Sequence, residues 1–381
     1  MPNKRKGRSR KAGDKIRVAF RRNRSRPARD KDWTRRVRAD AEGTADAALS
    51  ERIHAKGHLS RKRTIIAGDD EPAAGQQNTG TVVAMRGLIA EVDDGQRLWP
   101  CTVRRILRTR RIKERNPVTV GDHVRFVIEA DQQGVHSEGV IEAVEPRQGS
   151  LTRMVRRRRH TVVANVDQTI IVSSVAEPPC KPHLIDRYIV AAHAGNIEPV
   201  ICLNKTDLDE DEQAQRILRL YDALGYRTLA TSVRSGTGLE PLKQLLTNKC
   251  SAVTGQSGVG KSSLLNAIDP QLDLRVGEVS AETFKGRHIT STATLLKLDC
   301  GGYVVDTPGV RSFDLSDVPR GEIEMHFVEF AECIPHCKFP DCTHTHEAGC
   351  AVKQAFDDGR IAEERYGSYC RMLAEHRTTS P

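Results

Sequence analysis

Short apolar runs rich in β-branched residues fill residues 78–146 of the chain. Glycine, Asp-Asp and Asn-Pro sequences separate these runs, and such sequences are typical of turns. Five strands in so short a segment favour a small β-barrel of the OB type. The five expected strands are residues 80–85, 88–92, 99–104, 123–128 and 139–144.

From residue 167 onward, the pattern changes to apolar strands that alternate with amphipathic helices. In the expected helix at 210–224, for example, Ile217, Leu220 and Leu224 recur at the spacing of one helix face. Such alternation predicts an α/β domain in which helices cover a parallel sheet. The other strands are expected at 169–174, 198–203, 228–231 and 249–254, and the other helices at 184–194, 239–246 and 263–268.

Charge dominates the N-terminal segment. Residues 1–75 hold many Lys and Arg with few apolar positions, so we expect this segment to be disordered. The whole chain of 381 residues has a formal net charge of +10, which favours a polyanionic partner such as RNA. A solvated tail that only keeps the protein soluble is the alternative. A second basic cluster lies in the link at 147–166, which we expect to be a loop.

The sequence also indicates where in the cell the protein is located. No apolar run approaches the roughly 18 residues that a membrane helix needs, and the N-terminus begins with charge instead of an apolar signal core. We therefore expect a cytoplasmic protein that does not bind membranes. The sequence does not set the oligomeric state, although we expect a monomer. In such a compartment, ten cysteines indicate metal ligands or buried thiols rather than disulfides.

Residues 255–262 match the phosphate-binding pattern G-x-x-x-x-G-K-[ST], between an expected strand and an expected helix. In such a loop, backbone N–H groups and the helix N-terminus attract phosphate oxygens. Lys261 is expected to bridge the outer phosphates, and the Ser262 hydroxyl to ligate Mg²⁺. The residues expected to contact a nucleoside triphosphate here are Gly255, Gln256, Ser257, Gly258, Val259, Gly260, Lys261, Ser262 and Ser263.

The sequence Asn-Lys-Thr-Asp at 204–207 follows an expected strand, at the edge where such sheets bind ligands. The carboxylate of Asp207 can accept two hydrogen bonds from guanine N1–H and N2–H₂. Adenine lacks this donor pair, so GTP is favoured over ATP. The residues expected on the base side are Asn204, Lys205, Thr206, Asp207 and Ser232, the last of these through its backbone N–H to guanine O6.

A further strand from Tyr303 ends at Asp306, which would hold Mg²⁺ through water, while the N–H of Gly309 would contact the γ-phosphate. The polar segment 286–292 could bring a threonine to the metal. The sequence at 204–207, which we call the base reader, precedes the phosphate loop and Asp306 along the chain. In an ordinary GTPase the corresponding sequence comes last. Because the same sheet can form with its termini moved, the sequence predicts a circularly permuted GTPase domain.

Three cysteines and two histidines lie within fourteen residues near the C-terminus. A closed Cys₃His set is a tetrahedral zinc site of the structural kind. Reduced thiols without metal are the alternative. The four residues are Cys337, Cys342, His344 and Cys350, and composition alone does not force this choice because Cys333, His336 and His346 lie nearby.

Together these motifs resemble the RsgA (YjeQ) family of circularly permuted GTPases that act on the bacterial small ribosomal subunit. The resemblance spans roughly residues 78–377 and includes the sequences at 164–168, 186–188 and 365–369. It implies an OB barrel, a permuted GTPase domain and a small α-helical zinc-binding domain. The expected domains are a basic tail at 1–77, the barrel at 78–150, the GTPase domain at 151–318 and the zinc-binding domain at 319–381.

The resemblance also implies what the protein does. It implies binding to the small (30S) subunit and its 16S rRNA, a role late in subunit maturation, and GTP hydrolysis that the subunit stimulates. It also implies that the protein helps to release another assembly factor from the subunit. The expected cofactors are one structural Zn²⁺ and the Mg²⁺ that accompanies GTP. Val310 stands where many GTPases place a water-orienting glutamine, so we expect intrinsic hydrolysis to be slow.

The chain departs from the family's His-Thr-Thr switch sequence, because it reads His288, Ile289, Thr290. Thr290 is therefore preferred over Thr292 as the Mg²⁺ ligand. The expected catalytic residues are Lys261, Asp306 and His288, which would orient water; an rRNA contact is the alternative role for His288. The competing class of protein is an RNA-binding assembly factor that uses GTP only as a folding ligand.

Overall fold

The structure, a computed structural model, describes residues 15–19, 62–66, 77–104, 117–130, 137–155, 158–274, 293–306 and 318–378. The chain divides into two compact units, Met1–Ala74 and Gly75–Pro381. In the first unit, β1 (Lys15–Ala19) pairs with β2 (Lys62–Ile66) in an antiparallel sheet. This pairing differs from the disorder expected for the tail, and the β-branched residues of the two strands favour it.

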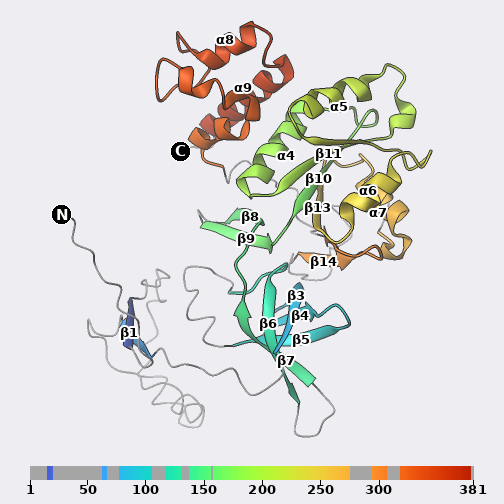
Figure 1. Cartoon of the computed structure of the whole chain (residues 1–381), viewed down its shortest axis with the longest axis vertical. Coiled ribbons are helices and arrows are strands. Elements are labelled where there is room, and N and C mark those ends of the chain that lie inside the picture. The colour runs from blue at the N-terminus through green and yellow to red at the C-terminus, as the bar shows by residue number, and fades with distance from the viewer. Residues whose placement is uncertain are drawn as a thin grey trace, which may run out of the picture. The chain divides into compact units, whose positions relative to one another are not determined.

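A five-stranded barrel opens the second unit, as the strand pattern predicted (Figure 1). β3 pairs with β4, β4 with β5, β5 with β7, and β7 with β6, and β6 pairs back with β3 to close the barrel. Apolar side chains from every strand fill the interior, among them the fully buried Val82, Cys101, Phe126 and Ile141. The strands are β3 (Gln77–Arg86), β4 (Ile89–Asp93), β5 (Leu98–Val103), β6 (His123–Ala130) and β7 (Ser137–Val144).

A β-hairpin follows the barrel, where a basic loop was expected. β8 (Ser150–Val155) pairs antiparallel with β9 (Arg158–Ala164), so the prediction of a loop at 147–166 was wrong. The β-branched run Thr161–Val163 favours the strand. The side chain of Asn165 then joins hairpin and barrel, donating to the Gly121 carbonyl at 2.9 Å.

The α/β domain contains a sheet of five parallel strands in the order β12-β11-β10-β13-β15. An antiparallel strand, β14, which the sequence did not predict, pairs with β15 and touches β3 of the barrel through Thr294 and Ala84. Barrel and sheet are therefore continuous. The strands are β10 (Gln168–Ser174), β11 (Glu198–Asn204), β12 (Arg227–Ala230), β13 (Cys250–Thr254), β14 (Thr294–Lys297) and β15 (Tyr303–Asp306).

Helices cover both faces of this sheet (Figure 1). Along β10, Ile171 packs with α4 and α5, whereas Ile170 and Val172 pack with α6 and α7. The carboxyl ends of β10, β11, β13 and β15 consequently share one edge, because these strands are parallel. The elements on the two faces are α4 (Pro182–Ala194), α5 (Gln213–Ala223), α6 (Leu239–Leu246) and α7 (Lys261–Ile268), and the short 3₁₀ turns are η2 (Thr206–Leu208) and η3 (Pro270–Leu272).

The C-terminal part of the chain is helical. Its core stacks Phe327, Phe330 and Tyr369, with ring centroids 5.0–5.4 Å apart. None of the helices in the described ranges is both long enough and apolar enough to span a membrane. The elements are η5 (Arg320–His326), η6 (Val328–Phe330), η7 (Ile334–His336), α8 (Ala351–Asp357) and α9 (Glu363–Thr378).

Candidate nucleotide and metal sites

The glycines of the phosphate loop adopt backbone conformations that other residues rarely reach. Gly255 has φ +141°, Gly258 +84° and Gly260 +94°. A Cβ on Gly255 would lie 2.0 Å from the carbonyl oxygen of Val172 on β10. Only glycine therefore lets the loop leave β13 this close to the neighbouring strand.

Lys261 opens helix α7 and lies against the phosphate loop. Its Nζ donates to the carbonyls of Gly255 at 2.9 Å and Gln256 at 2.8 Å. Burial lowers the pKa of this ammonium group. Ser262 and Ser263 belong to the same first helical turn, where backbone N–H groups are not used by the helix. The loop, the lysine and the helix N-terminus thus form one anion-binding arrangement.

The base reader is tied directly to the phosphate loop. Asn204 ends β11, is 2% exposed, and donates from Nδ2 to the carbonyl of Val259 at 2.8 Å. Thr231 in turn donates to Asn204 Oδ1 at 3.2 Å. A Cβ on Gly260 would lie 2.4 Å from Asn204 Nδ2, so this glycine is needed for the close approach. The two motifs therefore meet at one edge although they are far apart in sequence.

A neighbouring hydroxyl orients the carboxylate expected to read guanine. Ser232 Oγ donates to Asp207 Oδ1 at 2.5 Å, and the Thr206 hydroxyl donates to the Thr231 carbonyl at 3.1 Å. The backbone N–H of Ser232 already donates to the Thr237 carbonyl at 3.0 Å. The contact of this N–H with guanine O6 stays a prediction, and the bond from the Ser232 hydroxyl to Asp207 is one that sequence spacing alone did not indicate.

Lys205, between these residues, has φ +60°, and its Nζ donates to the carbonyl of Glu177 in the turn after β10. On the metal side, Asp306 is the last residue of β15, next to β13 in the sheet. Asp306 therefore lies at the same edge of the sheet as the start of the phosphate loop, which follows β13. The expected contacts of His288, Thr290 and Gly309 lie outside the described residues.

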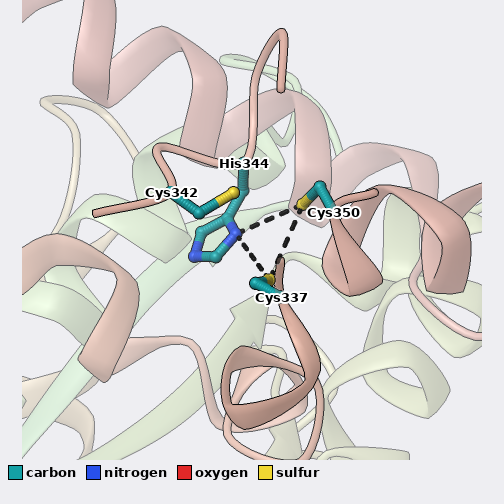
Figure 2. Close-up of side chains that lie close together, drawn as sticks. All are labelled: Cys337, Cys342, His344 and Cys350. Atoms are coloured by element: carbon teal, nitrogen blue, oxygen red, sulfur yellow. Dashed lines mark hydrogen bonds between the residues drawn. The ribbon is translucent and has the colours of Figure 1, made fainter. Parts of the chain in front are cut away.

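The four expected zinc ligands converge on one point (Figure 2). Their ligand atoms all lie within 4.8 Å of one another. His344 Nδ1 is 3.3 Å from Cys350 Sγ and 3.5 Å from Cys337 Sγ, and these two sulfurs are 3.9 Å apart. Around a tetrahedral ion with Zn–S bonds of about 2.3 Å, adjacent sulfurs lie about 3.8 Å apart. The donor set and its spacing therefore fit Zn²⁺.

The cysteine thiols at this point resist ionisation unless a cation is bound. Burial raises the pKa of Cys342 to about 12, and it raises the pKa of Cys350 as well. Crowded, buried thiols do not ionise unless a metal stabilises them as thiolates. His344 Nε2 faces Glu324 Oε2 at 3.1 Å, without the alignment of a hydrogen bond. A carboxylate at this position is what metal-bound histidines commonly have on their outer nitrogen.

Neighbouring side chains hold the backbone of the cysteine loop. The Glu347 carboxylate accepts from Thr343 N at 2.8 Å and Thr345 N at 3.0 Å. From α9, Tyr366 donates to the His344 carbonyl at 2.7 Å and Tyr369 to the Thr343 carbonyl at 3.0 Å. Sequence reasoning missed these supports and Glu324, because the contacts join segments that only folding brings together.

Known proteins share both the sequence and the fold. Residues 144–316 match the family model described as RsgA GTPase. A small ribosomal subunit biogenesis GTPase RsgA from Shewanella oneidensis is 41% identical over 312 residues, which cover 80% of this chain and 85% of the relative. The protein of that name from Thermotoga maritima is 41% identical over 302 residues, covering 78% of this chain and 96% of the relative.

Solved structures show the same architecture. The crystal structure of YjeQ from Thermotoga maritima superposes with a TM-score of 0.64 at 36% identity, covering 79% of this chain and 98% of that one. YloQ, described as a circularly permuted GTPase, superposes with a TM-score of 0.63 at 30% identity, covering 80% and 97%. This chain therefore belongs to the RsgA family of circularly permuted GTPases, which are GTP hydrolases.

Proposed function

We propose that this GTPase assists late maturation of the small ribosomal subunit and hydrolyses GTP faster when bound to that subunit. The relatives named as small ribosomal subunit biogenesis GTPases support the partner. The observation that best supports the nucleotide assignment is the Asn204–Val259 hydrogen bond, which joins the sequence proposed to read the base to the phosphate loop. Release of another assembly factor from the subunit is part of the same proposal.

The base site is proposed to select guanine. Asp207 would accept from guanine N1–H and N2–H₂ while the Ser232 hydroxyl donates one hydrogen bond to Oδ1 of the same carboxylate. Two exposed apolar side chains, Leu208 and Val233, lie next to these residues in the chain, and are 39% and 38% exposed. They offer apolar surface to the faces of a planar base.

Hydrolysis is assigned to the edge where β13 and β15 end. Ser262, Thr290 and Asp306 are the residues proposed to hold Mg²⁺, which supplies electrostatic stabilisation of the charged phosphates. Lys261 would bind the outer phosphates, Gly309 the γ-phosphate, and His288 would orient the attacking water. His288→Ala should lower subunit-stimulated turnover while GTP binding persists, and undiminished stimulated turnover would exclude this role.

The cysteine cluster is proposed to hold one structural Zn²⁺ through Cys337, Cys342, His344 and Cys350. A set of four protein ligands leaves no open position for a substrate, so a catalytic role is not proposed. The domain limits at 77, 150 and 318 remain proposals. RNA binding through the basic segments, with 16S rRNA as the target, would follow from the net charge of +10. A monomer in the cytoplasm fits this role.

Phosphate release from GTP and from ATP, with and without purified small subunits, tests the proposal. We expect slow release from GTP alone, strong stimulation by the subunit, and little release from ATP. If the subunit does not change the rate of GTP turnover, the proposed partner would be wrong, but the assignment as a GTPase would stand. A single turnover per chain would favour the competing class, an RNA-binding factor that uses GTP as a folding ligand.

A further inference from the structure

The turn between β10 and α4 lies between the two halves of the proposed nucleotide site. β10 is flanked by β11, which ends in the base reader, and by β13, which ends in the phosphate loop. The carbonyl of Glu177 accepts from Lys205 Nζ. Pro178 Cδ lies 3.5 Å from the position that a Cβ on Gly258 would take. This turn therefore touches both motifs, and the sequence motifs do not include it.

One buried hydroxyl closes the turn. Ser174 is fully buried at the end of β10, and its Oγ donates to the carbonyl of Pro178 at 2.7 Å. The N–H of Val175 donates to the Asn204 carbonyl at 3.1 Å, which anchors the start of the turn to the base-reader strand. Glu177 has φ +51°, a left-handed backbone conformation that is unfavourable for a non-glycine residue. Such a conformation persists only where contacts such as Ser174–Pro178 hold it.

We propose that Ser174 is a positioning residue for guanine nucleotide binding, acting through the turn on Lys205. The hydroxyl fixes the turn, and the Glu177 carbonyl then holds the Lys205 ammonium at the base site. A lysine side chain has a flexible four-carbon stem, and ordering it costs rotamer entropy. Ordering Lys205 before the nucleotide arrives lowers that cost on binding. This inference rests on the base-reader role proposed above.

A double-mutant cycle on fluorescent GDP binding tests this. Ser174→Ala should raise Kd about 3- to 10-fold, the size expected for loss of one buried hydrogen bond. Lys205→Ala should raise Kd as well, and adding Ser174→Ala to it should cause no further rise, because the two residues act in series. Ser174→Cys keeps the volume with a weaker donor and should bind at an intermediate Kd.

Thr169→Val is the matched control. Thr169 is equally buried on the same strand, and its Oγ1 has no hydrogen-bond partner among the described residues. Thr169→Val should therefore leave the Kd for GDP unchanged. The melting temperatures of all variants report any general loss of stability. The inference would be overturned if Ser174→Ala bound GDP with the wild-type Kd. It would also be overturned if the increase in Kd of the double variant equalled the product of the increases in the two single variants. Unchanged Kd in Lys205→Ala would overturn the inference together with the proposed base reader.

Discussion

At the scale of single residues, side chains that the motifs did not include prepare the nucleotide site. Ser232 orients Asp207, and Thr231 orients Asn204. The side chains of Asn204 and Asp207 are thus each held by a hydroxyl from the two residues that directly follow β12. Preorganised acceptors discriminate between bases because the wrong base leaves a polar group unpaired.

Asp207→Asn should weaken GTP binding about 10- to 100-fold, since an amide replaces one acceptor oxygen with a donor that opposes the guanine N–H groups. Competition of GTP and ATP against a fluorescent nucleotide measures the loss of preference. Asp209→Asn is the control, because the Asp209 carboxylate accepts from Gln213 N and Ala214 N at the start of α5. The asparagine oxygen can accept only one of these two hydrogen bonds, so this variant should lose some stability at the start of α5 but keep the preference for GTP. An unchanged preference in Asp207→Asn would argue against the base reader.

Gly255→Ala should abolish nucleotide binding and lower the melting temperature, because the added Cβ would meet the Val172 carbonyl at 2.0 Å. Gly225→Ala is the control for the effect of adding a Cβ at a position with positive φ. Gly225 also has a positive φ, +84°, but a Cβ there meets nothing within 4 Å. It should therefore cost only the backbone strain, roughly 1 kcal/mol. Equal melting temperatures for the two variants would contradict the steric argument.

At the scale of elements, the sequence predicted most strands and helices because local periodicity carries them. The apolar spacing of 210–224 predicted α5, and the apolar run at 169–174 predicted β10. β14 was missed because four residues, Thr294–Lys297, form a strand only through pairing with β15 and β3. The zinc ligand set stayed open in the sequence for a similar reason. Of the nearby candidates, only folding shows which side chains converge.

Zinc removal should destabilise the C-terminal helices, since the metal would link Cys337, Cys342 and His344 to Cys350 at the start of α8. We expect one Zn²⁺ per chain by elemental analysis, and loss of helical signal after chelation. Cys342→Ser should lose the metal. Cys333→Ala should keep it, because Cys333 packs in the core with its sulfur 3.9 Å from the Glu329 carbonyl. Metal loss in Cys333→Ala would show that the ligand set is wrong.

A buried ion network connects α9 to α4. Arg365 is 1% exposed and donates to Asp186 Oδ1 on α4 at 2.6 Å and to both Glu329 oxygens at 2.7 and 3.0 Å. Tyr221 of α5 also donates to Asp186 Oδ1, at 2.9 Å. The two acids raise the pKa of Arg365 despite its burial, so this side chain stays charged. The sequences at 186–188 and 365–369 therefore meet in one contact.

Arg365→Met should destabilise the protein by about 3–5 kcal/mol, because it leaves buried carboxylates without their cation. Arg360→Met, which removes an exposed arginine paired with Asp358, should cost under about 1 kcal/mol. Chemical denaturation measures both. Similar midpoints for the two variants would contradict the role assigned to the network.

At the scale of the second unit, one carboxylate links the barrel to the β14–β15 hairpin. Asp93 ends β4, is 5% exposed, and accepts from Lys297 Nζ at 2.9 Å and Tyr303 OH at 2.8 Å. The hairpin lies between the segments that hold His288 and Gly309 in the sequence. The barrel is therefore attached to the strands that connect the proposed switch residues.

Protonation of Asp93 should loosen this link. Burial alone would raise its pKa, but hydrogen bonds from Lys297, Gly95 N–H and Tyr303 outweigh burial and lower the pKa below 3.8. A carboxyl whose pKa is depressed by folding stabilises the folded state fully above its unfolded pKa. That contribution should be lost as the pH falls from 3.8 through the folded-state pKa.

Asp93→Asn should remove this contribution at neutral pH, at a cost of about 1.5–3 kcal/mol, the range for a hydrogen bond to a charged group. Because the loss is local, amide hydrogen exchange should speed up in residues 294–306 before the rest of the sheet responds. Asp94→Asn is the control, since Asp94 accepts from Trp99 Nε1 and from Gln96 N within the barrel itself. It should speed exchange in the barrel and leave the hairpin protected. Equal protection of 294–306 in wild type and Asp93→Asn would mean that backbone pairing between β3 and β14, and not Asp93, joins the two domains.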